Sequence, residues 1–370
     1  MVFSIKKRKV RVESLYKLFT FKLFKLKYMQ KYSFKNDYSE GFHPAMIEAL
    51  LATNLEQQQG YGEDVYCEKA REAIKRKIGS RNVDIHFVSG GTQANTIVIS
   101  SVLKSFEGVI SATTGHINVH ETGAIEATGH KVIQLSSNDG KIKPSDVLAV
   151  INKAEDHHIV RPKMVYISNA TEVGTIYSKK ELTALSAVCK DNGLYLYLDG
   201  ARLGSALCSE DNDLTFADLS KLTDVFYIGG TKNGAIMGEA IVINNDSLKK
   251  DFNYHLKQRG ALLSKGRLMG VQFLELFKEN LYFELAQHAN NMAKKMADAI
   301  KEKGYLFLTD PQSNQLFPIF PNTLIDQLSE KYEFYIWEKV DNDKSIVRLV
   351  TSWATQEDKV DEFIGDICKY

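Results

Sequence analysis

Short apolar segments alternate with helical patterns between residues 84 and 230 of this 370-residue chain. Each apolar segment is about five residues long and is bounded by turn residues, which is typical of strands covered on both faces. This alternation predicts one mostly parallel sheet with helices on both faces. We expect residues 235–243 to add an edge strand. Residues 246–303 are mostly helical in pattern, and the remainder predicts a small α+β domain.

These patterns predict a large domain over residues 32–250 and a small C-terminal domain over 251–370. Residues 1–31 carry ten Lys and Arg and one Glu, in a basic cluster followed by mixed aromatics, leucines and lysines. A targeting presequence, a basic membrane-surface helix or a nucleic-acid patch would fit this composition. We favour a disordered tail or a start codon assigned too early, because Met29 stands where the sequence turns globular.

The rest of the chain is mildly acidic, with 37 basic and 45 acidic residues from 32 to 370. This balance gives no support for nucleic-acid binding. No apolar run reaches the roughly 18 residues that a membrane span needs. The cysteines show no paired spacing, so we expect reduced thiols and a cytoplasmic location. They are Cys67, Cys189, Cys208 and Cys368.

Two predicted strands each end at a charged residue beside glycines. Residues 194–198 lead into Asp199, and residues 225–228 lead towards Lys232. A lone lysine here is usually a solvated surface residue, and an Asp before Gly usually makes a turn. The flanking apolar strands weaken that interpretation, because ligands bind at the carboxyl ends of such strands. A lysine with a lowered pKa, together with a carboxylate that holds a protonated ring nitrogen, is what a pyridoxal phosphate enzyme requires.

A glycine loop at residues 89–95 joins a predicted strand to a helix. Gly90 and Gly91 would let a phosphate approach the helix N-terminus, which predicts an anion site. The loop matches neither a P-loop nor GxGxxG, and a tight strand–helix turn is an equal alternative on its own.

Three titratable residues lie within residues 115–124, namely His116, His120 and Glu121. His116 can lie flat against an aromatic ring, and His120 and Glu121 can move protons. A single loop histidine is more often structural than catalytic. Their position after a strand of a sheet that already carries Lys232 and Asp199 favours a functional interpretation.

Arginines supply a further candidate feature. Arg202 follows Asp199 by three positions, and Arg348 lies in a predicted strand between Val347 and Leu349. An arginine in such a strand is either in a buried salt bridge or a bidentate clamp for a carboxylate. Residues 253–267 are also basic, and they predict either a solvated helix face or a contact to phosphate in a partner subunit.

In the order of these motifs, the chain resembles the aspartate-aminotransferase-type fold of pyridoxal phosphate enzymes. Within that fold it closely resembles the low-specificity threonine aldolases of the β-eliminating lyase group. The resemblance covers about residues 33–370. It rests on KND (35–37), YGED (61–64), GGTQAN (90–95), GHINVHETGA (115–124), DGAR (199–202), the Lys232 segment and VRLVT (347–351).

The resemblance implies roles for the matching residues. Lys232 forms the Schiff base with pyridoxal 5'-phosphate, Asp199 pairs with the pyridine nitrogen and His116 stacks on the ring. The other implied cofactor-binding residues are Gly91, Thr92, the amide of Gln93, Arg202, Thr231 and, from another subunit, Arg267. The implied substrate-binding residues are Asn36, Arg202 and Arg348. Glu121 belongs to the proton network at the β-hydroxyl, and no metal is implied.

The chain departs from the family pattern at two places. Gly90 stands where the phosphate loop usually has a serine. The loop after residues 164–168 usually carries Glu-Asn-Thr-His, whereas this chain reads Ser168, Asn169, Ala170, Thr171. A histidine sometimes assigned to base catalysis is therefore missing. The base is left open among His116, Glu121, His120 and a bound water.

The implied reaction is retro-aldol cleavage of L-threonine or L-allo-threonine to glycine and an aldehyde. The alternative is β-elimination or another lyase reaction on an amino acid, since the same cofactor serves both. A catalytically silent scaffold is a third possibility, which the presence of nearly every implied cofactor-binding residue argues against. The expected partners are a small amino acid and further copies of the chain, as a homodimer or homotetramer.

Overall fold

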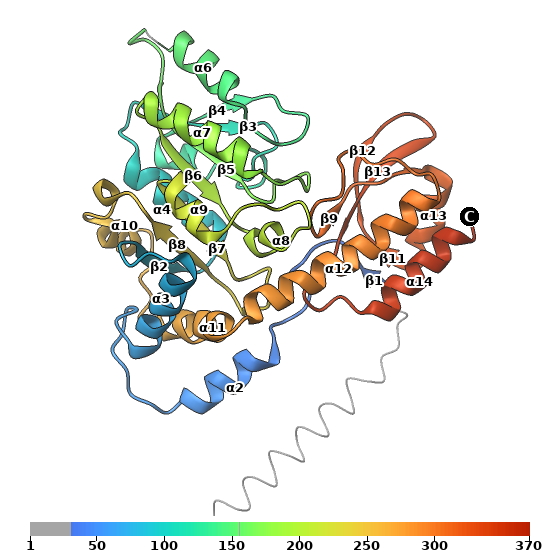
Figure 1. The fold of residues 1–370 in the computed structure, drawn as a ribbon, viewed down its shortest axis with the longest axis horizontal. Coiled ribbons are helices and arrows are strands. Elements are labelled where there is room, and N and C mark those ends of the chain that lie inside the picture. The colour runs from blue at the N-terminus through green and yellow to red at the C-terminus, as the bar shows by residue number, and fades with distance from the viewer. Residues whose placement is uncertain (1–30, 155) are drawn as a thin grey trace, which may run out of the picture.

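The computed structural model describes residues 31–154 and 156–370 (Figure 1). The expectation of a disordered basic tail therefore falls almost wholly outside the described residues. Within the described residues, no helix is both long enough and apolar enough to cross a membrane. The chain forms a large and a small unit, with a cavity at the edge of the larger one.

The large unit is built on one sheet, in which seven of the described strands pair. Their order is β2 (Asp84–Val88), β8 (Glu239–Ile243), β7 (Val225–Gly229), β6 (Tyr195–Asp199), β5 (Arg161–Ser168), β3 (Glu107–Ala112) and β4 (Lys131–Leu135). The pairs from β7 to β4 are all parallel, and β8 is antiparallel to both of its neighbours. The prediction of a mostly parallel sheet is confirmed.

The expectation of an edge strand at 235–243 is wrong. Strand β8 lies inside the sheet, between β2 and β7. The connection from β7 to β8 is too short for a crossover helix, so β8 returns antiparallel beside β7. Every residue of β8 is buried, as expected for an interior strand.

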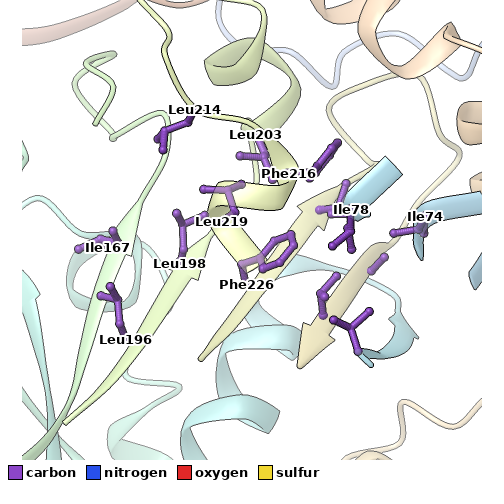
Figure 2. Close-up of a cluster of buried hydrophobic side chains, with 14 of the residues drawn as sticks. Ile74, Ile78, Ile167, Leu196, Leu198, Leu203, Leu214, Phe216, Leu219 and Phe226 are labelled. Carbon is purple, nitrogen blue, oxygen red and sulfur yellow. The ribbon is translucent and has the colours of Figure 1, made fainter. Parts of the chain in front are cut away.

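Side chains of the central strands alternate between two cores. Leu196, Leu198 and Phe226 lie on one face of the sheet, whereas Tyr197 and Tyr227 lie on the other. Figure 2 shows the first core, where α9 (Phe216–Leu222) packs over β6 and β7. Burial on both faces explains why these strands are continuously apolar or aromatic.

Helices cover both faces, as predicted. The first core also includes α3 (Val65–Ile78), α6 (Pro144–Lys153), α7 (Lys179–Asp191), α8 (Leu203–Leu207) and α11 (Arg267–Lys278). The second core includes α4 (Gly91–Val102), α5 (His116–Val119) and α10 (Phe252–Gln258). Helix α2 (Pro44–Thr53) packs on α11 at the periphery.

The small unit has its own sheet around the central strand β13 (Lys344–Val350). Its other strands are β9 (Gln315–Leu316), β10 (Ile319–Pro321) and β12 (Tyr335–Lys339), all antiparallel to β13. Helices α13 (Asn322–Ser329) and α14 (Glu357–Cys368) pack on it. Helix α12 (Leu281–Glu302) contributes Tyr282 to the large core and Met296 to the small core.

This packing corrects the predicted boundary at residues 250 and 251. Helices α10 and α11 follow that boundary but belong to the large cores. Conversely, β1 (Tyr32–Ser33) pairs with β11 (Tyr332–Glu333), and Phe34 packs in the small core. Amphipathic patterns show that a helix has a buried face, but not which core that face joins.

Candidate active site

A cavity of about 850 Å³ opens at the carboxyl edge of the large sheet. Residues at or after the carboxyl ends of five strands of that sheet line it: Ser89–Thr92, His116 with His120, Ser168 with Ala170 and Glu172, Asp199 with Ala201 and Arg202, and Thr231–Lys232. The small unit closes another side with Gln315, Tyr335–Trp337 and Arg348. The structure therefore brings together, in one cavity, the motif residues His116, Asp199, Arg202, Lys232 and Arg348.

Asp199 is buried at the end of β6, and described residues hold its carboxylate from several sides. Tyr166 donates to Oδ2 at 2.5 Å, and the Ala201 amide donates to Oδ1 at 3.0 Å. The Tyr227 hydroxyl also donates to Oδ1. Burial and the negative charge of Asp199 raise the pKa of both tyrosines well above the ordinary value, so they remain neutral donors.

Asn95 links Asp199 to the histidine loop. Its amide nitrogen donates to Glu121 at 2.7 Å and to Asp199 at 3.3 Å, and its oxygen accepts from Tyr197. Glu121 lies 2.8 Å from Nδ1 of His116 and does not line the cavity. The Glu121 carboxylate is therefore placed to fix the orientation of the His116 ring, behind the wall of the cavity.

Lys232 lies on the cavity wall, where burial and the nearby Arg202 guanidinium lower the pKa of its amine. A lowered pKa increases the neutral fraction that can attack a carbonyl group. Burial raises the pKa of the neighbouring Glu239 to about 8, although the Gly230 amide donates to its Oε2 at 2.8 Å.

Arg202 forms a bidentate ion pair with Asp37. The distances are 2.7 Å from Nε to Oδ2 and 2.9 Å from Nη2 to Oδ1. Asn314 of the small unit also donates to Asp37 at 2.9 Å. Burial alone would raise the pKa of Asp37, but the charges of Arg202 and Lys232, together with the hydrogen bonds from Arg202 and Asn314, outweigh it and lower that pKa to about 2. Asp37 therefore remains ionised and balances one of the two cavity arginines.

Arg348 has no such partner among the described residues. One of its terminal nitrogens donates to Gln315 at 2.7 Å, while Nε is buried without a hydrogen bond. Burial and the Arg202 charge lower the pKa of this guanidinium to about 10. Of the two sequence interpretations, a clamp for a ligand carboxylate fits better than a buried salt bridge.

The first turn of α4 is open at its N-terminus. Gly90 precedes it, and no side chain caps its amides. A Cβ atom on Gly91 would lie 2.9 Å from the Tyr227 hydroxyl oxygen. Only glycine therefore leaves room for an anion to approach the amides of this turn. The Gln93 side chain folds back to accept from Ser89, which leaves its backbone amide for an anion.

Two further predicted residues, Asn36 and Arg267, lie away from the cavity. The Asn36 side-chain oxygen accepts from the Tyr38 amide at 2.9 Å and from Ser39, within its own turn. Arg267 donates to backbone carbonyls of Thr53 and Glu56 at the end of α2. Neither lines the cavity of its own chain.

Several site residues carried no clear sequence signal. Tyr166 and Tyr227 are indistinguishable from core aromatics in an apolar strand, and Asn95 lies within a helix. Asp37 belongs to the KND segment quoted above, but its partner Arg202 lies 165 positions further along the chain. Glu172 lies in a loop where the sequence showed only the absence of a histidine.

Comparison with known proteins identifies the family. A family model described as beta-eliminating lyase matches residues 36–321. The chain belongs to the beta-eliminating lyase family. A Pseudomonas sp. relative named low specificity L-threonine aldolase is 32% identical over 91% of this chain and 97% of its own length. Its Pseudomonas aeruginosa namesake is 30% identical over 90% of this chain and 96% of its own length. These matches confirm the resemblance drawn from the motifs.

Solved structures agree with the family assignment. A Leishmania major structure described as threonine aldolase is 48% identical, with a TM-score of 0.90, covering 91% of this chain and 99% of that one. An aspartate aminotransferase from Thermus thermophilus has a TM-score of 0.68 at 13% identity, covering 92% and 91%. The similarity to the aspartate aminotransferase confirms the predicted aspartate-aminotransferase-type fold of this chain.

We expect Asp37→Asn to destabilise this beta-eliminating lyase by about 3–5 kcal/mol at pH 7, because it removes one partner of a buried ion pair. The pKa of Asp37 is about 2 in the fold, against an ordinary value of 3.8. Its stabilising effect is thus present above pH 3.8 and is lost as pH falls through about 2. The free energies of unfolding of the unmodified chain and of Asp37→Asn, both measured in urea, should therefore differ less at pH 3 than at pH 7.

The matched control is Asp310→Asn, at an exposed loop position. It should change stability by no more than about 0.5 kcal/mol at either pH. Equal effects of the two substitutions at pH 7 would show that the Asp37–Arg202 pair does not stabilise the fold.

Proposed function

We propose that this chain binds pyridoxal 5'-phosphate and cleaves a β-hydroxy-α-amino acid, L-threonine or L-allo-threonine, to glycine and an aldehyde. The names of the 32%-identical Pseudomonas relative and of the 48%-identical Leishmania structure support this activity. The observation that carries it is the meeting of Lys232, Asp199 and Arg348 in one cavity, with no carboxylate partner for Arg348 among the described residues.

The residues around the cavity fit this cofactor. The Asp199 carboxylate is positioned to hold a protonated ring nitrogen, and Lys232 supplies an amine with a lowered pKa. The open amides of α4 suit a phosphate. When bound, pyridoxal phosphate supplies an electron sink for the pair left on Cα as the Cα–Cβ bond breaks.

Residues of the chain then bind and orient the substrate. Arg348 provides a desolvated guanidinium for the substrate carboxylate, and Arg202 stands beside it with its charge balanced by Asp37. A carboxylate anchored on one side would restrict how the substrate is oriented in the cavity. His116, held by Glu121 through Nδ1, supports the ring from the histidine loop.

We expect Lys232→Ala to lose covalent cofactor retention and all measurable cleavage. The assay is incubation with cofactor, reduction with borohydride and peptide mapping, alongside product analysis from L-threonine and L-allo-threonine. Glycine with acetaldehyde supports an aldolase, whereas a 2-oxo acid with ammonia supports the elimination alternative. Lys153→Ala, at an exposed site on α6, is the control. A label found on a lysine other than Lys232 would disprove the assignment.

Arg348→Ala should weaken binding of glycine about 10- to 100-fold, because hydrogen bonds to charged groups contribute about 1.5–3 kcal/mol. Spectrophotometric titration of the cofactor-loaded protein with glycine measures this directly. Cofactor retention should be unchanged, since Arg348 belongs to the small unit. Glycine affinity equal to that of the unmodified chain would mean that another group binds the carboxylate.

We also propose that the working unit is a homodimer or homotetramer in which Arg267 contacts the phosphate bound by a neighbouring subunit. Its support is that Arg267 does not line the cavity of its own chain. Arg267→Ala should then weaken cofactor retention about tenfold or more. Sedimentation velocity reports the assembly state, and a fully active monomer would contradict the proposal.

We place the protein in a reducing, cytoplasmic compartment. All four cysteines are free, and Cys67 and Cys189 are buried. Free thiols persist where disulfides do not form. Recovery of the protein from an oxidising compartment would contradict this location.

A further inference from the structure

Glu172 is a carboxylate on the cavity wall to which the motifs assign no role. It lies between β5 and α7, in the loop of residues 169–178. Its side chain reaches the histidine loop, where it accepts from the backbone amide of His116 at 2.9 Å. It also accepts from the Ser168 hydroxyl at 2.7 Å. Neither donor is a cation.

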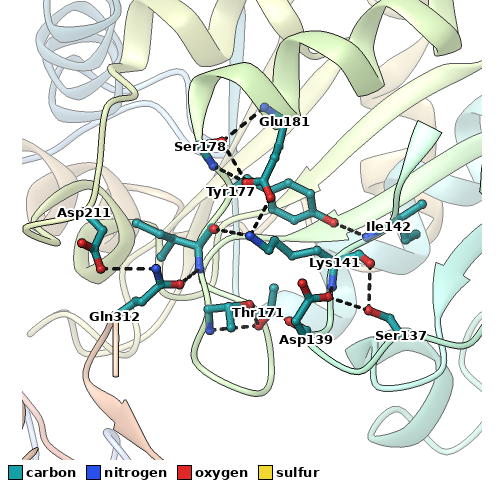
Figure 3. A network of polar contacts seen from close by, with 12 residues as sticks. Ser137, Asp139, Lys141, Ile142, Thr171, Tyr177, Ser178, Glu181, Asp211 and Gln312 are labelled. Atoms are coloured by element: carbon teal, nitrogen blue, oxygen red, sulfur yellow. Dashed lines mark hydrogen bonds and ion pairs between the residues drawn. The ribbon is translucent and has the colours of Figure 1, made fainter. Parts of the chain in front are cut away.

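The loop does not depend on Glu172 for its own position. Thr171 and Thr175 bond through their hydroxyls at 2.7 Å, and Thr175 donates to the Asp139 carbonyl at 2.7 Å. Figure 3 shows this anchoring, together with the bond of 3.1 Å from the Ile176 amide to Gln312 of the small unit. Both units thus hold the loop, and the half-buried Glu172 carboxylate accepts hydrogen bonds only from Ser168 and the His116 amide among the described residues.

The surroundings of Glu172 disfavour its charged form without preventing it. Burial and the Asp199 carboxylate raise its pKa above the ordinary value for glutamate, while the Ser168 hydroxyl acts in the opposite direction. The other charged or titratable groups around it are His116, Arg202, Tyr166 and Tyr177. Carboxyl groups of raised pKa are suited to proton transfer near neutral pH.

The other candidate bases are less well placed. Glu121 lies behind His116 and does not line the cavity. His116 is bonded to Glu121 through Nδ1, as expected for a ring held against a planar ligand. His120 is exposed at the rim. Partial burial, and then the charge of His116, lower its pKa, and His120 is more exposed to solvent than Glu172.

We propose that Glu172 is the base that accepts the β-hydroxyl proton of the substrate. This inference rests on the proposed function. As the O–H proton passes to the Glu172 carboxylate, the Cβ–O bond becomes the carbonyl of the leaving aldehyde. The Cα–Cβ electron pair stays on Cα, for which the bound cofactor would supply the electron sink, and one proton returned to Cα gives glycine. Atoms balance, because substrate equals glycine plus aldehyde.

Glu172→Gln tests the proposal, because glutamine can still accept from His116 and Ser168 but cannot take a proton. The cofactor-loaded variant should keep its absorption spectrum and bind glycine, which has no β-hydroxyl, within about twofold of the unmodified chain. Its kcat for L-threonine or L-allo-threonine should fall about 100-fold or more. Glu172→Asp, which keeps the carboxylate, should retain a larger part of the activity.

The pH profile separates a base from a positioning residue. A base must be deprotonated, so activity falls as pH drops through the pKa of Glu172. Ser168→Ala removes a donor that favours the charged form, so this acid limb should move to higher pH. If Glu172 only oriented His116, Ser168→Ala would not change the pH at which the acid limb falls.

Three results would overturn the proposal. They are cleavage by Glu172→Gln at the unmodified rate, loss of glycine binding together with cleavage, and disappearance of the acid limb in His120→Gln instead. If the unmodified chain binds cofactor and glycine but cleaves neither substrate, the proposed function itself fails. If it cleaves and Glu172→Gln cleaves equally, only the role of Glu172 fails.

Discussion

The site depends on the close approach of two turns, one after β6 and one after β7. A Cβ on Gly200 would lie 1.8 Å from the Tyr227 carbonyl oxygen, so no larger residue fits there. The Gly229 amide donates to the Gly200 carbonyl at 2.9 Å and joins the turns directly. Because the turns touch, Asp199 and Lys232 enter the same cavity from neighbouring parallel strands.

Charge around the cavity is divided by function. Asp37 neutralises Arg202 through a bidentate pair, and Asn314 holds that pair from the small unit. Arg348 keeps an unpaired Nε, and Gln315 satisfies only one of its terminal nitrogens. Among the described residues, the charge of Arg202 is therefore balanced and that of Arg348 is not. An anionic ligand should bind with its negative group towards Arg348, which gives it a single preferred orientation.

The sequence predicted the features that repeat locally and missed those made by distant contacts. Strands β6 and β7 were found because their apolar runs are short and end in glycine. The pairing of Arg202 with Asp37 joins residues 165 positions apart and has no local pattern. Tyr166 and Tyr227 look like core aromatics until Asp199 is placed between them. Helices α10 and α11 were assigned to the wrong unit, because amphipathicity does not name a partner.

Helix α12 sets a mechanical limit on the cavity. Its first turn is embedded in the large core with Tyr282, and its last turns are embedded in the small core with Met296 and Ile300. A helix of 22 residues is about 33 Å long and keeps its own hydrogen bonds throughout. The two units that line the cavity are therefore joined by one continuous helix. A change in the separation of the two units therefore requires side-chain repacking at the ends of α12 or bending of the helix itself.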